Sequence, residues 1–123
     1  MLILLTLLGC AHTGPLPSGT WGGDGYTLDV PEDGAPVLRG ACGQGVVEGP
    51  LVADAQSAVV AELTWTTPSG AEEPGRIDAS ARGRKLTGHL VVGSFPEMID
   101  DIELKRGREG TLGACEGENI PPG

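Results

Sequence analysis

The chain has 123 residues, with 17 Asp and Glu against 8 Lys and Arg, and a formal net charge of −9. This length suffices for one small domain and excludes two. The acidic balance disfavours phosphate backbones and anionic lipid headgroups, so we expect no nucleic acid partner. The 21 Gly and 10 Pro residues interrupt the chain every few positions, which favours an all-β domain over helices of ordinary length.

The N-terminus begins with an apolar run that is too short to cross a bilayer as a permanent helix. We interpret residues 1–9 as a signal peptide. No Lys or Arg precedes this run, so the translation start could lie upstream. Its end, Leu7-Leu8-Gly9-Cys10, resembles the bacterial lipobox. That resemblance implies cleavage after Gly9, lipid on Cys10 and a place in the bacterial cell envelope, whereas the alternative is a short core element with a buried cysteine.

We interpret residues 10–19 as the lipidated cysteine and a flexible tether, because the segment after Cys10 is polar and contains Pro and Gly. Each buried methylene contributes about 0.8 kcal/mol, so a few acyl chains would hold a small domain at the membrane. Under the Gram-negative sorting pattern, Ala11 directly after Cys10 implies the outer membrane, with the protein facing the periplasm.

The alternation of apolar and polar residues predicts about eight strands within residues 20–116, followed by a disordered tail at 117–123. We expect a single antiparallel meander that closes into a small barrel or a sandwich. In chain order the predicted strands are Trp21–Val30, Val37–Cys42, Gly45–Val52, Ser57–Thr67, Arg76–Arg82, Lys85–Gly93, Asp101–Lys105 and Thr111–Cys115. The residues predicted to face inward are Tyr26, Leu28, Val30, Val59, Ala61, Leu63, Trp65, Ile77, Ala79, Ala81, Leu86, Gly88, Leu90, Val92, Ile102 and Leu104.

The connecting segments carry turn residues. Arg82-Gly83-Arg84-Lys85 is typical of a hairpin turn, and Ser94–Asp100 predicts a loop or a single helical turn. The glycine-dense stretches 22–25 and 40–45 indicate turns or bulges, because no following helix could present its N-terminus to a phosphate.

Two cysteines remain once Cys10 is assigned to lipid. Cys42 and Cys115 form an even pair in a compartment that permits oxidation, so we predict a disulfide that stabilises the fold by roughly 4 kcal/mol. Two free buried thiols are the alternative, and the absence of a Cys-x-x-Cys motif disfavours a redox pair.

The sequence offers no clear catalytic constellation, so we expect no enzyme, no cofactor and no metal site. His12 falls in the tether and His89 on the polar face of a predicted strand, and no serine stands in a Gly-x-Ser-x-Gly motif. Glu72-Glu73 and Asp100-Asp101-x-Glu103 could bind calcium or act as paired carboxylates, but solvated surface charge is the favoured interpretation.

The segment Gly19-Thr20-Trp21, entering the first strand, resembles the opening of lipocalin- and avidin-type barrels. The resemblance implies that Trp21 plugs the barrel floor. A lipobox, a small β domain and one disulfide are also similar to envelope lipoproteins that inhibit lysozymes or metalloproteases, although the Ser-Gly-x-x-Tyr motif of the lysozyme inhibitors is absent. The chain further resembles small Gly-rich bacterial lipoproteins.

We therefore expect a membrane-anchored envelope lipoprotein that binds a small apolar ligand or an envelope protein without catalysing a reaction. Such a protein needs a pocket or an exposed strand edge. The alternative, an inhibitor of a lysozyme or protease, needs a protruding loop such as Pro68–Gly75 or Ser94–Asp100. Small inward residues such as Ala79, Ala81 and Gly88 leave open a barrel that is filled by its own side chains.

The lipobox can be tested by the substitution Cys10→Ser. We expect the variant to lack acyl chains and to be unprocessed or soluble, because lipid supplies nearly all of the membrane affinity. Mass spectrometry of the purified chain and membrane fractionation after a high-salt wash measure the two effects. A variant that stays with the washed membranes would contradict the lipobox interpretation.

Overall fold

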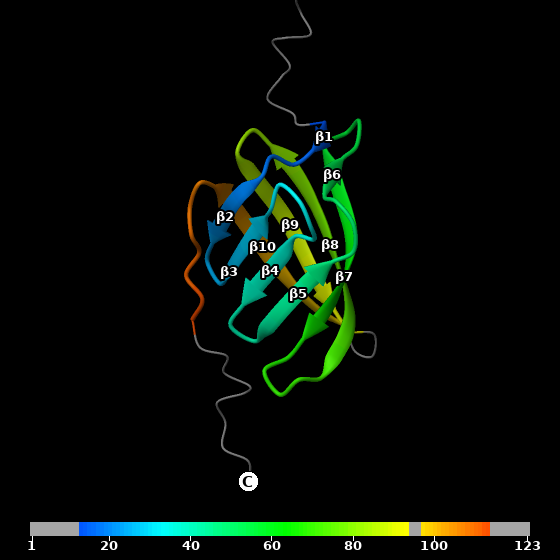
Figure 1. Ribbon diagram of the computed structural model, residues 1–123, viewed down its shortest axis with the longest axis vertical. Coiled ribbons are helices and arrows are strands. Elements are labelled where there is room, and N and C mark those ends of the chain that lie inside the picture. Colours follow the sequence, from blue (N-terminus) through cyan, green and yellow to red (C-terminus); the bar gives the residue numbers. More distant parts are fainter. Residues whose placement is uncertain (1–12, 94–96, 114–123) are drawn as a thin grey trace, which may run out of the picture.

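The computed structural model describes residues 13–93 and 97–113, which form strands and connecting turns without a helix (Figure 1). Within these ranges, nothing has the length and apolarity of a membrane-crossing helix. The strands are β1 (Gly14–Pro15), β2 (Gly19–Gly23), β3 (Tyr26–Val30), β4 (Val37–Gly40), β5 (Gly43–Val47), β6 (Val52–Ala53), β7 (Ala58–Thr66), β8 (Glu72–Arg82), β9 (Lys85–Val92) and β10 (Met98–Arg106).

Eight of these strands close into an antiparallel barrel, which confirms the predicted all-β fold and selects the barrel over the sandwich. Around the barrel the strand order is β7-β5-β4-β3-β2-β10-β9-β8. The pairing of β8 with β7 closes the ring. Apart from β1 and β6, strands that follow one another in the chain are neighbours in space, as in a meander. The short strands β1 and β6 pair with each other, and Ala53 of β6 pairs with Val59 of β7.

The barrel interior is built from the residues that the alternation predicts. Leu28, Ile77 and Leu86 are fully buried, and Tyr26 and Ala61 pack partly buried against this core. Successive strand residues point to opposite faces, so each strand of a closed barrel supplies every second side chain to the interior. The core members are Leu16, Trp21, Leu28, Val30, Leu38, Val47, Leu51, Ala53, Val59, Leu63, Trp65, Ile77, Ala79, Ala81, Leu86, Leu90, Val92, Ile102 and Leu104.

Glycines on β4 and β5 make room for the two largest rings at one end of the barrel. A Cβ atom at Gly40 would lie 2.8 Å from Cε1 of Tyr26, and one at Gly43 would lie 2.7 Å from Nε1 of Trp65. Real side chains cannot approach so closely, so these positions require glycine as long as the rings keep their places.

The predicted strand Trp21–Val30 is wrong as a single strand, because it is the hairpin of β2 and β3. The chain turns at Asp24 and Gly25, and Gly25 has φ +88°, a left-handed conformation that glycine adopts without strain. Gly22 and Gly23 have no side chains, so they do not interrupt the alternation of apolar and polar residues. The sequence pattern therefore gives no sign of the turn between β2 and β3.

Three other predicted boundaries are corrected. The predicted strand Gly45–Val52 comprises most of β5, a turn and the start of β6, and the predicted loop Ser94–Asp100 gives Met98–Asp100 to β10. The predicted strand Thr111–Cys115 is not formed in its described part, because Thr111 makes one isolated parallel bridge to Asp24. Residues 114 and 115 lie outside the described ranges. The closed barrel has eight strands, in agreement with the predicted count of about eight, although the boundaries of several strands differ from the prediction.

Residues 14–19 of the predicted tether lie within the described part of the chain. Gly14 and Pro15 form β1, Leu16 is 6 % exposed in the core, and the Leu16 amide donates to the Leu51 carbonyl at 2.9 Å. The carbonyl of Ser18 accepts two hydrogen bonds from the Arg106 guanidinium at the end of β10. Within the predicted tether, the barrel structure thus includes the residues from Gly14 onward.

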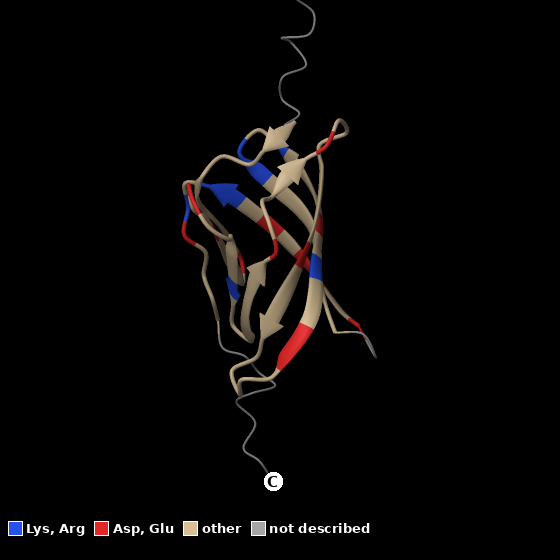
Figure 2. Cartoon of the chain, turned by 45° about the vertical axis from the view of Figure 1, so that its right-hand side comes forward, with Lys and Arg blue, Asp and Glu red and all other residues tan. Residues whose placement is uncertain are grey.

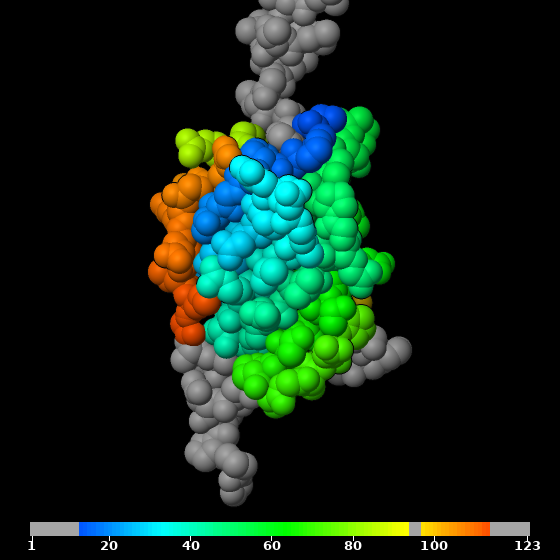
Figure 3. Space-filling view, viewed as in Figure 1, coloured from blue at the N-terminus to red at the C-terminus, as the bar shows by residue number. Residues whose placement is uncertain are grey.

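After β10 the chain turns back and crosses the outer face of β2 and β3, where Figure 3 shows orange residues directly against blue ones. We call Gly107–Thr111 the return segment. The Gly110 amide donates to Oγ1 of the buried Thr27 at 2.8 Å, and the Thr111 amide donates to the Gly23 carbonyl at 3.1 Å. A Cβ atom at Gly22 would lie 2.3 to 2.4 Å from backbone atoms of this segment. The return segment can therefore pack here only because Gly22 has no side chain.

Substituting Gly22 tests this contact. Gly22→Ala should lower the free energy of unfolding by about 3 kcal/mol, because backbone atoms must move to admit the methyl group. Urea denaturation followed by tryptophan fluorescence measures the effect. Gly113→Ala is the matched control, since a Cβ atom there meets no atom within 4 Å. Equal stability of the two variants would contradict the close packing of the return segment.

Candidate functional site

The two ends of the barrel differ (Figure 1). One end, which we call the N-terminal end, holds β1, the β8–β9 turn and the end of β10. The other end holds the β2–β3, β4–β5 and β7–β8 turns and the start of β10. There a pocket of about 220 Å³, which we call the distal mouth, is lined by Gly25, Tyr26, Ala41, Cys42, Trp65, Leu90, Val92, Met98 and Asp100.

Most of the distal mouth is apolar. Trp65 is 3 % exposed, and its Nε1 donates to the Cys42 carbonyl at 3.3 Å, so a hydrogen bond fixes the indole ring. Leu90 and Val92 of β9 form the floor as buried core residues, and Met98 lies at the rim with 59 % exposure. A methionine at the edge of an apolar pocket adapts readily to the shape of what it contacts.

One pair of polar side chains crosses the mouth. The Tyr26 hydroxyl on β3 donates to Oδ2 of Asp100 on β10 at 2.5 Å. β2 lies between these two strands and pairs with β10 only at Lys105 and Arg106, so this part of β10 has no backbone partner on the side of β3. The Tyr26 side chain therefore links the barrel wall across a place where backbone pairing is missing.

Burial, the hydrogen bond to Asp100 and the negative charge of Asp100 all raise the pKa of the Tyr26 hydroxyl. Near neutral pH the phenol therefore stays protonated and acts as a donor. Asp100 accepts this hydrogen bond at Oδ2, and a carboxylate has further lone pairs that can accept other hydrogen bonds.

The predicted acidic motif Asp100-Asp101-x-Glu103 does not converge on one site. Asp100 takes an inward position of β10, whereas Asp101 and Glu103 lie on the outer face, where they bind His89 at 3.1 Å and Lys85 at 2.9 Å. Glu72 and Glu73 are consecutive in β8 and so point to opposite faces. In residues 13–93 and 97–113, no three His, Cys, Asp or Glu side chains are grouped as metal ligands.

The other predicted site residues are distributed along the chain. Trp21 is 1 % exposed at the N-terminal end, and its Nε1 donates to the Pro17 carbonyl at 3.4 Å. Its role as a plug stays a prediction. Cys42 lies in the β4–β5 turn, whereas Cys10, Cys115 and His12 lie outside the described residues, so the lipidation and the disulfide also stay predictions.

The loops expected of an inhibitor are small in the described part. Of Pro68–Gly75, the residues from Glu72 onward belong to β8, which leaves a tight turn that the Gly70 amide closes on the Thr67 carbonyl at 2.9 Å. Of Ser94–Asp100, residues 94–96 lie outside the described part and Met98–Asp100 are in β10.

A second hollow of about 510 Å³ lies on the outer face of β9, β10 and the return segment. Its charged lining has both signs, including Asp101 and Glu103 beside Lys105 and Arg108. Ligand sites are mostly apolar with a few convergent polar groups, which describes the distal mouth better than this larger hollow.

Comparison with known proteins gives no match to a family model, a curated protein or a solved structure.

The sequence analysis names Asp100 in an acidic motif but misses its inward position, because the predicted strand begins at Asp101 whereas β10 begins at Met98. The signal that could have found it is the continued alternation of Met98, Asp100, Ile102 and Leu104, in which one acidic residue takes an inward position. An acidic side chain at an inward position near a strand end is a candidate for a binding site.

The Tyr26–Asp100 pair can be tested by titration, because Tyr26 is the single tyrosine of the chain. The ultraviolet absorbance of tyrosinate in the folded protein should rise only above the ordinary tyrosine pKa of about 10. Since the folded-state pKa is raised, the stabilisation is complete below the unfolded-state pKa and is lost as pH rises through the folded-state pKa.

Two substitutions sharpen this titration. Asp100→Asn should bring the Tyr26 pKa closer to its ordinary value, whereas Asp101→Asn on the outer face should leave it unchanged. Identical titration of Tyr26 in the folded and urea-unfolded protein would show that the pair is not formed.

Proposed function

We propose that this protein is a non-enzymatic binding protein of the bacterial envelope, held at a membrane by lipid on Cys10, and that its distal mouth takes a small apolar group with a cationic or hydrogen-bond-donating end. The observation that carries the binding proposal is the apolar pocket with Asp100 at its rim. The lipid anchor is supported by the lipobox at Leu7–Cys10, and Ala11 favours the outer membrane.

The barrel interior supports binding at the mouth rather than along the axis. Leu28, Leu38, Leu86 and Leu104 are fully buried and fill the centre of the barrel. A small barrel of eight strands has room for little more than its own side chains. A ligand that entered the axis would have to displace close-packed leucines, which costs several kcal/mol.

The size and chemistry of the mouth restrict the occupant. A volume of about 220 Å³ is smaller than the pockets that bury drug-sized molecules, so the mouth fits one ring or one short apolar chain. Such a group can belong to a small ligand or to a side chain that an envelope protein presents. The Asp100 carboxylate favours a positive charge beside it, and Tyr26 and Trp65 supply aromatic rings that attract cations.

The position of the mouth also suits an anchored protein. The strand β1 lies at the N-terminal end (Figure 1), and the residues that line the mouth belong to the other end of the barrel. A lipid on Cys10 would hold the first end near the membrane and leave the mouth open to the surrounding compartment.

Binding can be measured with 2-phenylethylamine, whose ring and ammonium group match the pocket, followed by NMR chemical-shift changes on the full chain. We expect shifts confined to the residues of the distal mouth. Asp100→Asn should weaken the binding about tenfold through loss of a charge-assisted hydrogen bond. Phenylacetate, with a negative charge in place of the ammonium, should bind far more weakly.

Asp101→Asn is the matched control for charge, because Asp101 adjoins Asp100 in β10 but lies on the outer face with 91 % side-chain exposure. It should leave the affinity for 2-phenylethylamine unchanged. Equal binding of the amine and phenylacetate, or shifts outside the mouth, would overturn the proposed site.

A further inference from the structure

Positive charges are concentrated at the N-terminal end of this acidic protein (Figure 2). Of the 8 Lys and Arg residues, only Arg39 and Arg76 lie elsewhere. The remaining six come from the β8–β9 turn region and from the end of β10 with the return segment. We call them the basic corner, and they are Arg82, Arg84, Lys85, Lys105, Arg106 and Arg108.

The strand register places three of these cations side by side. Arg82 on β8 is opposite Lys85 on β9, and Lys85 is opposite Lys105 on β10. Like charges directly opposite each other on one face of a sheet destabilise it. A row of three cations across neighbouring strands is therefore expected where an anionic partner lies over it.

Few carboxylates neutralise this row. Glu103 pairs with Lys85 at 2.9 Å, and the Arg106 guanidinium donates to the Ser18 carbonyl. All of the other four cations are exposed, and within residues 13–93 and 97–113 none of them forms an ion pair: Arg82, Arg84, Lys105 and Arg108.

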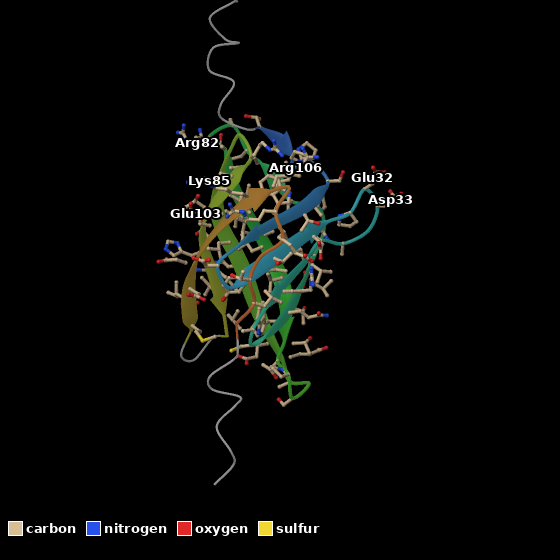
Figure 4. The ribbon with its side chains drawn as sticks, turned by 90° about the vertical axis from the view of Figure 1, so that its left-hand side faces the viewer. Glu32, Asp33, Arg82, Lys85, Glu103 and Arg106 are labelled. Atoms are coloured by element: carbon tan, nitrogen blue, oxygen red, sulfur yellow. The ribbon has the colours of Figure 1, made fainter. Side chains whose placement is uncertain are left out.

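Two acidic residues of the same end, Glu32 and Asp33, are kept apart from the basic corner, whereas Glu103 lies beside Lys85 and Glu109 follows Arg108 in the return segment. Glu32 and Asp33 lie in the β3–β4 loop, on the side opposite Arg82 and Lys85 (Figure 4). On one side of the N-terminal end six cations thus outnumber Glu103 and Glu109, although the chain as a whole carries −9. The expected repulsion of anionic lipid headgroups, drawn from the net charge, does not apply to this side.

The short link to Cys10 brings the basic corner close to any membrane that holds the lipid. Gly14 is fixed by its pairing with Ala53, and the four residues from Cys10 to Gly14 span at most about 14 Å. Electrostatic attraction to headgroups extends over a Debye length of about 8 Å at physiological ionic strength. A lipid on Cys10 would therefore hold Gly14 at most about 14 Å from the membrane, which is less than two Debye lengths.

We propose that the basic corner docks on a membrane surface that carries anionic phospholipid headgroups, which tilts the barrel toward β8, β9 and β10. The proposal rests on the lipid anchor of the proposed function, since the anchor supplies most of the affinity and the basic corner sets the orientation. Glu32 and Asp33 are then turned away from the headgroups, and the distal mouth remains accessible.

Docking can be measured without the lipid on Cys10. A negative result then argues against docking by the basic corner and leaves the lipid anchor untested by this experiment. The full chain with Cys10→Ser is mixed with vesicles of phosphatidylcholine alone or of phosphatidylcholine with phosphatidylglycerol, and the bound fraction is found by sedimentation. The apolar residues 1–9 carry no charged side chain, and the variants compared below share them, so they do not bias the comparison between variants. We expect about tenfold tighter binding to the anionic vesicles at low salt, and loss of this preference at high salt.

A pair of matched variants locates the contact. Arg84→Glu, in the basic corner, should weaken binding to the anionic vesicles about tenfold. Arg76→Glu makes the same change of charge on β8 outside the corner and should change the binding less than about twofold. Equal binding to both kinds of vesicle, or equal loss in the two variants, would overturn the docking proposal. Mass spectrometry of the wild-type chain reports the acylation of Cys10 independently.

Discussion

Closure of the barrel depends on a narrow seam between its first and last strands. β10 and β2 pair only where Lys105 faces Gly22 and where Arg106 faces Trp21. The Arg106 guanidinium reinforces this seam with hydrogen bonds of 3.0 and 2.6 Å to the Ser18 carbonyl. A closed sheet has no free edges, so the stability of every other strand pair benefits from this contact. The return segment adds a second layer over the seam and makes a glycine at position 22 obligatory.

Much of the barrel could be predicted from the sequence because its strands alternate strictly. Val59, Leu63, Ile77 and Leu86 carry the pattern, and each faces inward as predicted. The hairpin of β2 and β3 could not be found in this way, since Gly22 and Gly23 leave no side chain to show which face is inside. The extent of the tether also escaped prediction, because two-residue pairing in β1 leaves no periodic signal.

The candidate site was less predictable than the fold. The alternation predicts Tyr26 inside, but its partner Asp100 is distant in the chain and falls within the predicted loop Ser94–Asp100. The contact between Tyr26 and Asp100 exists because β10 extends beyond the end of β2. This extension follows from the pairing register of β10 with β2 and β9, which the local composition does not reveal. The basic corner could not be predicted from composition either, because the net charge of −9 does not say where on the fold the charged residues lie. Only the pairing of β8, β9 and β10 brings Arg82, Lys85 and Lys105 into one row.

The pairing of β1 with β6 also has a mechanical consequence. A force pulling on Cys10 would reach the barrel first through β1, which is held by two residue pairs and by the Leu16 amide on Leu51. Peeling β1 away would lengthen the link by a few residues, up to the point where the Ser18 carbonyl is held by Arg106. The domain would thus gain roughly 14 Å of reach before the barrel itself bears any load. Single-molecule pulling from the N-terminus would show this as a small extension that precedes unfolding.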